Sequence, residues 1–155
     1  MPEPLSETLT QLITVFEALE HCLTQEYDAL VRRDLVAIAE CASEKESHSA
    51  LMDRLKLRLD AQLAHVETGT DSRLATLVTQ AEEPLKQELE PLHNRLVEVS
   101  TECRHQNAVN GKVVHRAQQS VTELARILSG TNADPLYTAS GRTRHAGAGH
   151  QLGSA

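Results

Sequence analysis

The sequence predicts an all-α protein, and three features of its 155 residues lead to that fold class. Leu and Ala, which favour helices, contribute 22 and 18 residues, respectively. The aromatic residues that fill the inner faces of β-sheets are reduced to one Phe and two Tyr. Apolar residues recur every three or four positions through most of the chain, which is the period of one helix face. We therefore expect an antiparallel bundle of about three helices and no strand.

The first helix is expected at about residues 5–33. Its apolar face consists of residues that follow one another at spacings of three and four: Leu9, Leu12, Phe16, Leu19 and Leu23. Ser6 is a suitable N-cap for this helix. Further along, the charged Glu26 takes a position on the apolar face, and Asp34 is able to cap the start of a new helix. We expect a kink or a short break next to Asp34.

The second helix is expected at about residues 34–66. Its apolar face is formed by two groups of residues: Leu35, Ile38 and Ala42, and then Met52, Leu55, Leu59, Leu63 and Val66. Between the two groups lies a polar section at residues 43–49. This section contains neither Gly nor Pro, so we expect it to stay helical.

A short third helix is expected at about residues 71–83, after a turn at residues 67–71 that contains Gly69. Since this turn is too short for a crossover connection, we expect neighbouring helices to run antiparallel. Pro84 interrupts the helical pattern, because proline lacks a backbone donor and clashes with the preceding turn. It is expected either to start the next helix or to kink a continuous one.

The longest helix is expected at about residues 84–129, which would span roughly 68 Å. Spacings of four and three alternate along a heptad seam: Leu85, Leu89, Leu92, Leu96, Val99, Cys103, Gln106, Asn110, Val113 and Ala117. One phase slip follows the seam, and the apolar spacing then continues to the end of the helix. A helix of this length is too long to be covered everywhere by a compact bundle, so it resembles a coiled-coil strand.

The seam contains two adjacent polar positions, Gln106 and Asn110, and Gly111 follows them. Buried amides in a seam fix the register or the number of partners. A glycine within a helix permits the close approach of another backbone or marks a bend. The alternative is that these residues are only a tolerated irregularity.

The chain divides into a helical domain at residues 1–130 and a tail at residues 131–155. Gly130 is expected to end the long helix. The tail holds four of the seven glycines and few large apolar residues. It cannot bury enough apolar surface to offset its conformational entropy, so we expect it to be flexible or to become ordered only on a partner.

Composition excludes several classes of partner and compartment. The formal net charge of −7 opposes binding to a nucleic-acid backbone. The longest apolar run, residues 35–39, is far too short to cross a membrane, and the N-terminus does not resemble a signal peptide. The cysteines Cys22, Cys41 and Cys103 are far apart, as expected for small buried side chains in a reducing compartment. We expect a protein of the cytoplasm, with no membrane insertion.

Catalytic and metal-binding motifs are not recognisable in the sequence. The eight histidines include no pair at i,i+4, although a zinc site needs convergent ligands. There is no glycine-rich phosphate loop and no nucleophile motif. We therefore expect no catalytic residue, no cofactor and no metal, and the protein is not expected to be an enzyme.

Three short motifs carry a resemblance to a known family. The run Cys103–Val114 resembles the "NxxNG plus two aliphatics" signature of the FlgN-type flagellar type III export chaperones. The segment Leu136–Arg142 is similar to their "Y…G" element after the long helix. In the first half, Leu30–Leu35 together with Lys45 and Leu51 is similar to their "L..RDL…K..L" pattern.

The resemblance implies a cytoplasmic, non-enzymatic chaperone. Its expected partners are the C-terminal amphipathic helices of the hook-associated proteins, which form the hook–filament junction. It would keep these proteins from assembling early and deliver them to the flagellar export gate, with components of the export ATPase complex as further candidate partners. By the same resemblance, Tyr137 is the expected contact with the export gate. The alternative for Tyr137 is that it folds back with Leu136 onto the long helix near Leu128.

The expected client-binding residues lie on the second half of the long helix, where a client helix would complete the apolar face. They are Asn110, Val113, Val114, Ala117, Val121, Leu124, Ile127 and Leu128. One alternative is that the first helix covers these residues within the chain. Another is a different function, in which the protein is a structural scaffold that self-associates as a coiled coil.

Overall fold

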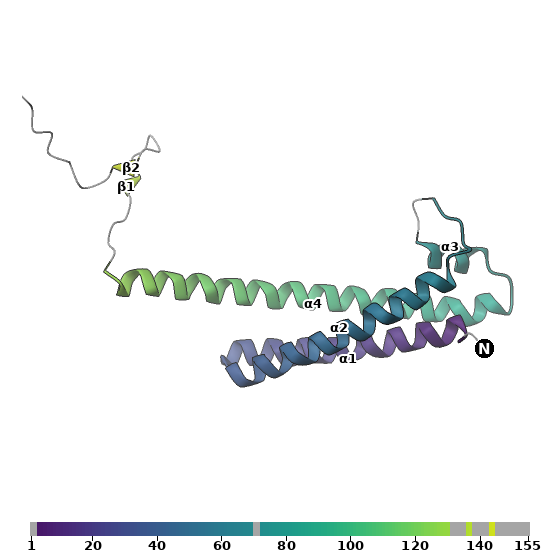
Figure 1. The fold of residues 1–155 in the computed structure, drawn as a ribbon, viewed down its shortest axis with the longest axis horizontal. Coiled ribbons are helices and arrows are strands. Elements are labelled where there is room, and N and C mark those ends of the chain that lie inside the picture. The colour runs from purple at the N-terminus through teal and green to yellow at the C-terminus, as the bar shows by residue number, and fades with distance from the viewer. Residues whose placement is uncertain (1–2, 70–71, 131–135, 138–142, 145–155) are drawn as a thin grey trace, which may run out of the picture. The chain divides into compact units, whose positions relative to one another are not determined.

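The computed structural model describes residues 3–69, 72–130, 136–137 and 143–144. It contains four helices, α1 (Leu5–Arg32), α2 (Leu35–Gln62), α3 (Arg73–Gln80) and α4 (Leu85–Leu128) (Figure 1). The fold class is therefore all-α, with three long helices and the short α3 between α2 and α4 in the sequence. The strands β1 (Leu136–Tyr137) and β2 (Thr143–Arg144) form one antiparallel pair, and they are the departure from the expectation of no strand.

The chain forms two compact units, Met1–Val114 and His115–Ala155. The first unit contains α1, α2, α3 and the first part of α4. The second contains the rest of α4 and the strand pair. The expected boundary between helical domain and tail, at residue 130, stays a prediction, since most of the tail at 131–155 lies outside the described residues.

The helices α1 and α2 are joined by a tight break at Arg33 and Asp34, as expected. Arg33 adopts a left-handed backbone conformation (φ 57°), and its N–H donates to the carbonyl of Leu30 at 3.2 Å. The Asp34 carboxylate then accepts a hydrogen bond from the N–H of Ala37 at 3.1 Å, which caps the start of α2. These local bonds terminate α1 and reverse the chain.

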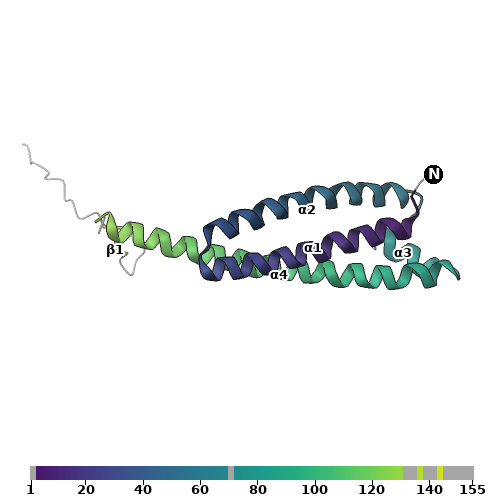
Figure 2. The ribbon, with the colours of Figure 1, turned by 90° about the horizontal axis from the view of Figure 1, so that it is seen from below.

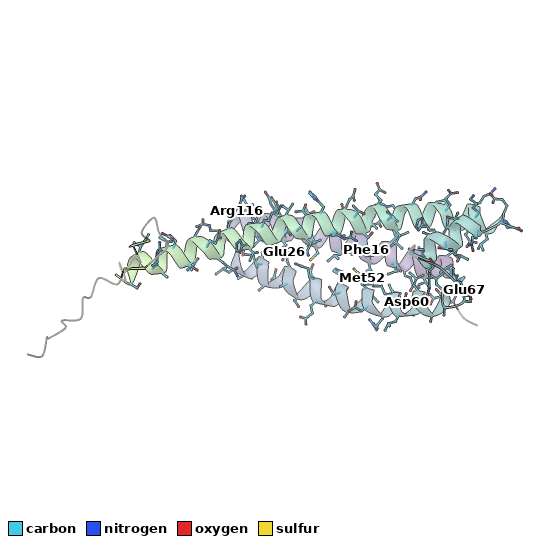
Figure 3. The ribbon with its side chains drawn as sticks, turned by 90° about the horizontal axis from the view of Figure 1, so that it is seen from above. Phe16, Glu26, Met52, Asp60, Glu67 and Arg116 are labelled. Carbon is cyan, nitrogen blue, oxygen red and sulfur yellow. The ribbon has the colours of Figure 1, made fainter. Side chains whose placement is uncertain are left out.

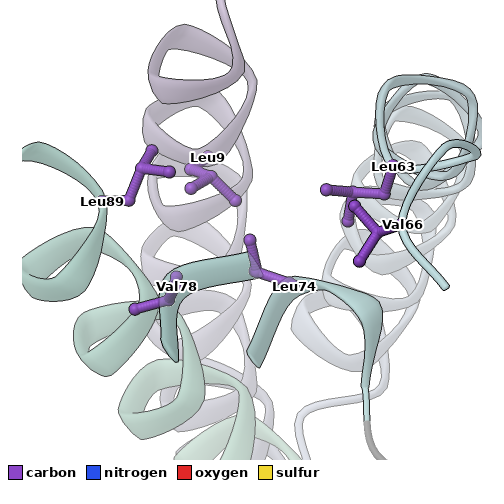
Figure 4. Packing of buried hydrophobic residues seen from close by; sticks show 6 residues of the cluster. All are labelled: Leu9, Leu63, Val66, Leu74, Val78 and Leu89. Carbon is purple, nitrogen blue, oxygen red and sulfur yellow. The ribbon is translucent and has the colours of Figure 1, made fainter. Parts of the chain in front are cut away.

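Buried side chains from all four helical segments meet at one end of the first unit (Figure 4). The cluster consists of Leu9 from α1, Leu63 and Val66 at the end of α2 and beyond it, Leu74 and Val78 from α3, and Leu89 from α4. Burying a side chain of this size stabilises the fold by about 1.5–3 kcal/mol. A second cluster, formed by Leu12, Val15 and Leu55, continues the contact between α1 and α2.

The helices α1 and α4 run parallel within the first unit. The thiol of Cys103 donates to the carbonyl of Phe16 at 3.2 Å, and the Asn110 amide donates to the carbonyl of Leu23 at 2.8 Å. In both pairs the residue on α4 is 87 positions after its partner on α1. A step of seven residues towards the C-terminus of α1 therefore corresponds to a step of seven residues towards the C-terminus of α4, so the two helices point the same way. In Figure 2, α1 lies between α2 and α4.

The expectation of antiparallel neighbours concerned consecutive helices, and the parallel helices α1 and α4 are not consecutive in the chain. Sequential long helices with short connections alternate in direction, so the first and the third must point the same way. Only α2 runs against its two neighbours. Among the described residues, no helix combines the length and the hydropathy needed to cross a membrane.

Candidate functional site

A buried polar network occupies the seam between α1 and α4. Asn110 is only 2 % exposed, although it carries an amide. Its Nδ2 donates to the Leu23 carbonyl and to Glu26 Oε2, each at 2.8 Å. Its Oδ1 accepts a hydrogen bond from Gln106 Nε2 at 2.9 Å. Both polar seam positions are thus hydrogen-bonded inside the first unit.

Glu26 connects this network to α2. Lys45 Nζ lies 3.1 Å from both carboxylate oxygens of Glu26, and it donates to Asn107 Oδ1 at 3.3 Å. In Figure 3, Glu26 lies between the ribbons of α2 and α4. The Glu26 side chain is 11 % exposed and that of Lys45 is 30 % exposed, so the carboxylate is more shielded from water than the ammonium group. The network therefore ties the three long helices together.

The contacts of the network favour one alignment of α4 against α1. A buried carboxylate is costly unless it is paired and hydrogen-bonded, and Glu26 meets both conditions only when Asn110 and Lys45 lie opposite it. A slip of α4 along α1 would remove these partners. Such polar residues in a helix seam specify one alignment at some cost in stability.

Gly111 does not mark a close approach of another backbone. A Cβ built on this residue would meet nothing within 4 Å, and the residue is exposed. The sequence left open whether this glycine permits a close approach of another backbone or marks a bend. The described residues do not support the close approach. The amides beside Gly111 are by contrast an organised part of the seam.

The three cysteines are buried and free. Cys22 Sγ donates to the carbonyl of Cys41 at 3.5 Å, which links α1 to α2. Burial raises the pKa of the Cys22 and Cys103 thiols to about 11 each, so both are protonated at neutral pH. A protonated, buried thiol is a poor nucleophile and a poor metal ligand. Within the described part of the chain, no group of three His, Cys, Asp or Glu is arranged to hold a metal ion.

The expected client-binding residues divide between the two units. In the first unit, Asn110 is buried, Val113 is half-buried and Val114 is exposed. In the second unit, the remaining five residues are exposed on one side of α4, and we call them the α4 stripe: Ala117, Val121, Leu124, Ile127 and Leu128. Asn110 is thus engaged within the chain, whereas the α4 stripe is uncovered.

The α4 stripe continues the helix face that packs against α1 in the first unit. Its spacing of four, three and four, through Val121, Leu124 and Leu128, follows on from the seam. Side chains on other faces of this part of α4 are polar, as at Gln119, Thr122 and Glu123. The amphipathic character of α4 therefore extends beyond the part that the bundle uses.

Tyr137 lies in β1, where its register partner in β2 is Thr143. Leu128, onto which Tyr137 was alternatively expected to fold, is 83 % exposed.

Sequence reasoning did not identify the contact between Glu26 and Lys45. The sequence does show that Glu26 is charged on an apolar helix face and that Lys45 lies in a polar section. That the two side chains contact each other depends on how α1 packs against α2.

The comparisons with known proteins identify a family. The family model described as FlgN protein matches residues 1–145, which is nearly the whole chain and includes all three motifs noted in the sequence. No curated protein and no solved structure matches the chain.

Proposed function

The chain belongs to the FlgN family and is a flagellar export chaperone, and we propose that its clients are the hook-associated proteins of the hook–filament junction. In this proposal the chaperone binds their C-terminal amphipathic helices in the cytoplasm. It prevents premature assembly and delivers the clients to the export gate, with components of the export ATPase complex as further partners. The family supports the general role, and the exposed face of α4 supports the mode of binding.

The observation that carries the proposal is the exposure of the α4 stripe. Leu124 is 57 % exposed, Val121 is 66 % exposed and Leu128 is 83 % exposed, all on one helix face. Contiguous exposed apolar side chains mark interaction sites on soluble proteins. From Ala117 to Leu128 the stripe extends about 16 Å, which is three turns of a client helix. Val113 and Val114 would extend the same surface by one turn.

An amphipathic client helix fits this surface chemically. Its apolar face would cover the α4 stripe as α1 covers the seam in the first unit, and its polar face would remain in water. Each large side chain removed from water contributes about 1.5–3 kcal/mol before the entropy of association is subtracted. Masking the client's own apolar face is also what would prevent it from assembling before export.

A second candidate function uses the same observation. The heptad-like spacing of the α4 stripe is also suited to pairing with a second copy of the chain, as in a scaffolding coiled coil. In that case the stripe would already be covered in the resting protein, and a client helix would have to displace the second copy.

Binding stoichiometry tests the proposal. The full chain is mixed with the C-terminal peptide of a hook-associated protein, and the mass of the complex is measured by light scattering, with the affinity taken from calorimetry. We expect a complex of one chaperone and one peptide. A stable homo-oligomer whose mass does not change when the peptide is added would favour the scaffold and contradict the chaperone of junction proteins.

A further inference from the structure

A groove runs between α2 and α4 in the first unit, with α1 as its floor. It encloses about 340 Å³. Phe16, Leu19 and Leu23 line its floor at spacings of three and four, and Met52 lines it from α2. Phe16, Leu19 and Met52 are only half-buried, so the floor is an apolar surface open to solvent. In Figure 3, Phe16 of α1 and Met52 of α2 both lie between the ribbons of α2 and α4.

The charged residues that line the groove are all cations: Lys45, Lys56 and Arg104. No acidic residue lines it, although the chain as a whole carries a formal charge of −7. Lys45 is neutralised by Glu26, but Lys56 and Arg104 are exposed and have no hydrogen bond or ion pair with the described residues. They stand on opposite walls, Lys56 on α2 and Arg104 on α4. The groove thus combines an apolar floor with two unpaired positive charges.

We propose that this groove binds an acidic amphipathic helix of a partner protein. Apolar side chains of that helix would rest on Phe16, Leu19 and Met52, and its carboxylates would pair with Lys56 and Arg104. From Lys45 to Lys56 the α2 wall is about 16 Å long, which corresponds to about three turns of helix. The proposal concerns a surface of the first unit and goes beyond the proposed function, which uses the α4 stripe.

The charge of the groove also selects among occupants. The chain's own segment 131–155 contains one acidic residue, Asp134, and two arginines, Arg142 and Arg144. It is therefore net positive and would be repelled by Lys56 and Arg104. The experiment below distinguishes a partner helix from a second copy of the chain.

The experiment measures binding of a defined probe to the full chain by fluorescence anisotropy. The probe is a labelled helical peptide of about four turns with Leu on one face and Glu on the other, and its matched control carries Lys in place of Glu. We expect the Glu peptide to bind and to lose affinity as salt is raised, because exposed charge pairs are screened. The Lys peptide is expected to bind at least about tenfold more weakly.

Charge-reversal variants assign the binding to the groove. The double variant Lys56→Glu/Arg104→Glu is expected to weaken binding of the Glu peptide about tenfold, since two attractive pairs become repulsive. Arg54→Glu makes the same charge change on α2 at a residue outside the groove lining, and it should leave the affinity unchanged. Circular dichroism checks that each variant is folded. If the double variant does not fold, the neutral pair Lys56→Gln/Arg104→Gln replaces it.

Three results would overturn the proposal. The first is equal binding of the Glu peptide by the wild type and by the double variant. The second is binding that appears only after residues 131–155 are deleted, which would make that segment the occupant. The third is a dimer, detected by sedimentation, that the double variant dissociates, which would make a second copy the occupant.

Discussion

The amide nitrogen of Asn110 lies 2.8 Å from a carboxylate oxygen of Glu26, and this contact joins α4 to α1 across 84 residues of sequence. Lys45 binds the same carboxylate from α2, so an acidic side chain of α1 is held by residues of α2 and α4. The contact explains why a charged residue is tolerated on the apolar face of α1. We therefore expect the stability of the protein to depend on the residue at position 110.

We predict that Asn110→Asp destabilises the protein strongly. The substitution keeps the shape of the side chain but removes both Nδ2 donors and places a carboxylate against the Leu23 carbonyl and Glu26. Leaving buried groups unsatisfied costs about 1–3 kcal/mol, and the like charge adds to this cost. Urea denaturation gives the free energy of unfolding. Asn107→Asp is the matched control, because its carboxylate would face Lys45 Nζ, and its stability should equal or exceed that of the wild type.

We predict that Gly111→Ala stabilises the protein. Gly costs roughly 1 kcal/mol relative to Ala in the interior of a helix, and an added Cβ at this position meets nothing within 4 Å. The free energy of unfolding should therefore rise by about 1 kcal/mol in the same urea experiment. A loss of stability would mean that the glycine serves a bend or a contact of the working protein. Unchanged client binding would show that Gly111 is not part of the client surface.

We predict that the stability of the protein falls as pH rises from about 9 to about 11. Burial raises the pKa of Cys22 and Cys103 from 9.0 to about 11, so the unfolded chain loses these protons first. The stabilisation is complete below pH 9 and is lost as pH approaches 11. Thermal unfolding of Cys103→Ala against the wild type isolates one thiol: the variant should show a smaller decline over this range. An identical decline would assign it to other groups.

Much of the fold could be predicted from the sequence, because it depends on local patterns. The spacing of Leu89, Val99 and Cys103 predicted the seam, and these side chains are buried. The capping ability of Asp34 predicted the break after α1. Leu85 was expected in the seam but is 43 % exposed, at the first residue of α4.

What the sequence could not predict depends on contacts between helices. The parallel pairing of α1 with α4 follows from the three-helix topology rather than from any residue pattern. The partners of Glu26 come from α2 and α4, far away in sequence. The spacing of residues therefore showed that a charged side chain lies on the apolar face of α1, but not that Lys45 and Asn110 bind it. Likewise, a stripe such as Val121 and Leu124 has the same spacing whether it is buried or exposed, so the pattern alone could not show that both side chains are exposed.

We predict that Val121→Asp and Leu124→Asp each weaken client binding while the free protein stays folded. Both side chains are more than half exposed, so the substitutions should change stability by no more than about 0.5 kcal/mol. In the complex the new carboxylate would be buried without a partner, and the affinity should fall about tenfold or more. Calorimetry with the client peptide and thermal unfolding monitored by circular dichroism give the two quantities.

The matched control for the stripe is Gln119→Asp, which adds the same charge to an exposed position of α4 outside the stripe. It should bind the client as the wild type does. Wild-type affinity in both stripe variants would place the client elsewhere. Unfolding of both free variants would mean that the stripe is internal core in solution, as in the alternative in which the first helix covers it.

The last prediction separates the two proposed partners, the client and the export gate, by means of Tyr137. In β1, Tyr137 is paired through its backbone with Thr143, so Tyr137→Ala should preserve the strand pair while removing the ring. Tyrosine is a frequent anchor in interfaces, because it adds a large contact area with little side-chain entropy to lose.

The Tyr137→Ala chain should bind the client peptide as the wild type does, bind the cytoplasmic domain of the export gate more weakly, and slow secretion of the junction proteins. The two affinities are measured on the same preparation, with Tyr137→Phe as the control that keeps the ring and should keep most of the gate affinity. If Tyr137→Ala loses client binding and keeps gate binding, the tyrosine serves the client instead. If neither affinity changes, the gate contact lies on other residues, and the resemblance that pointed to Tyr137 does not extend to its role.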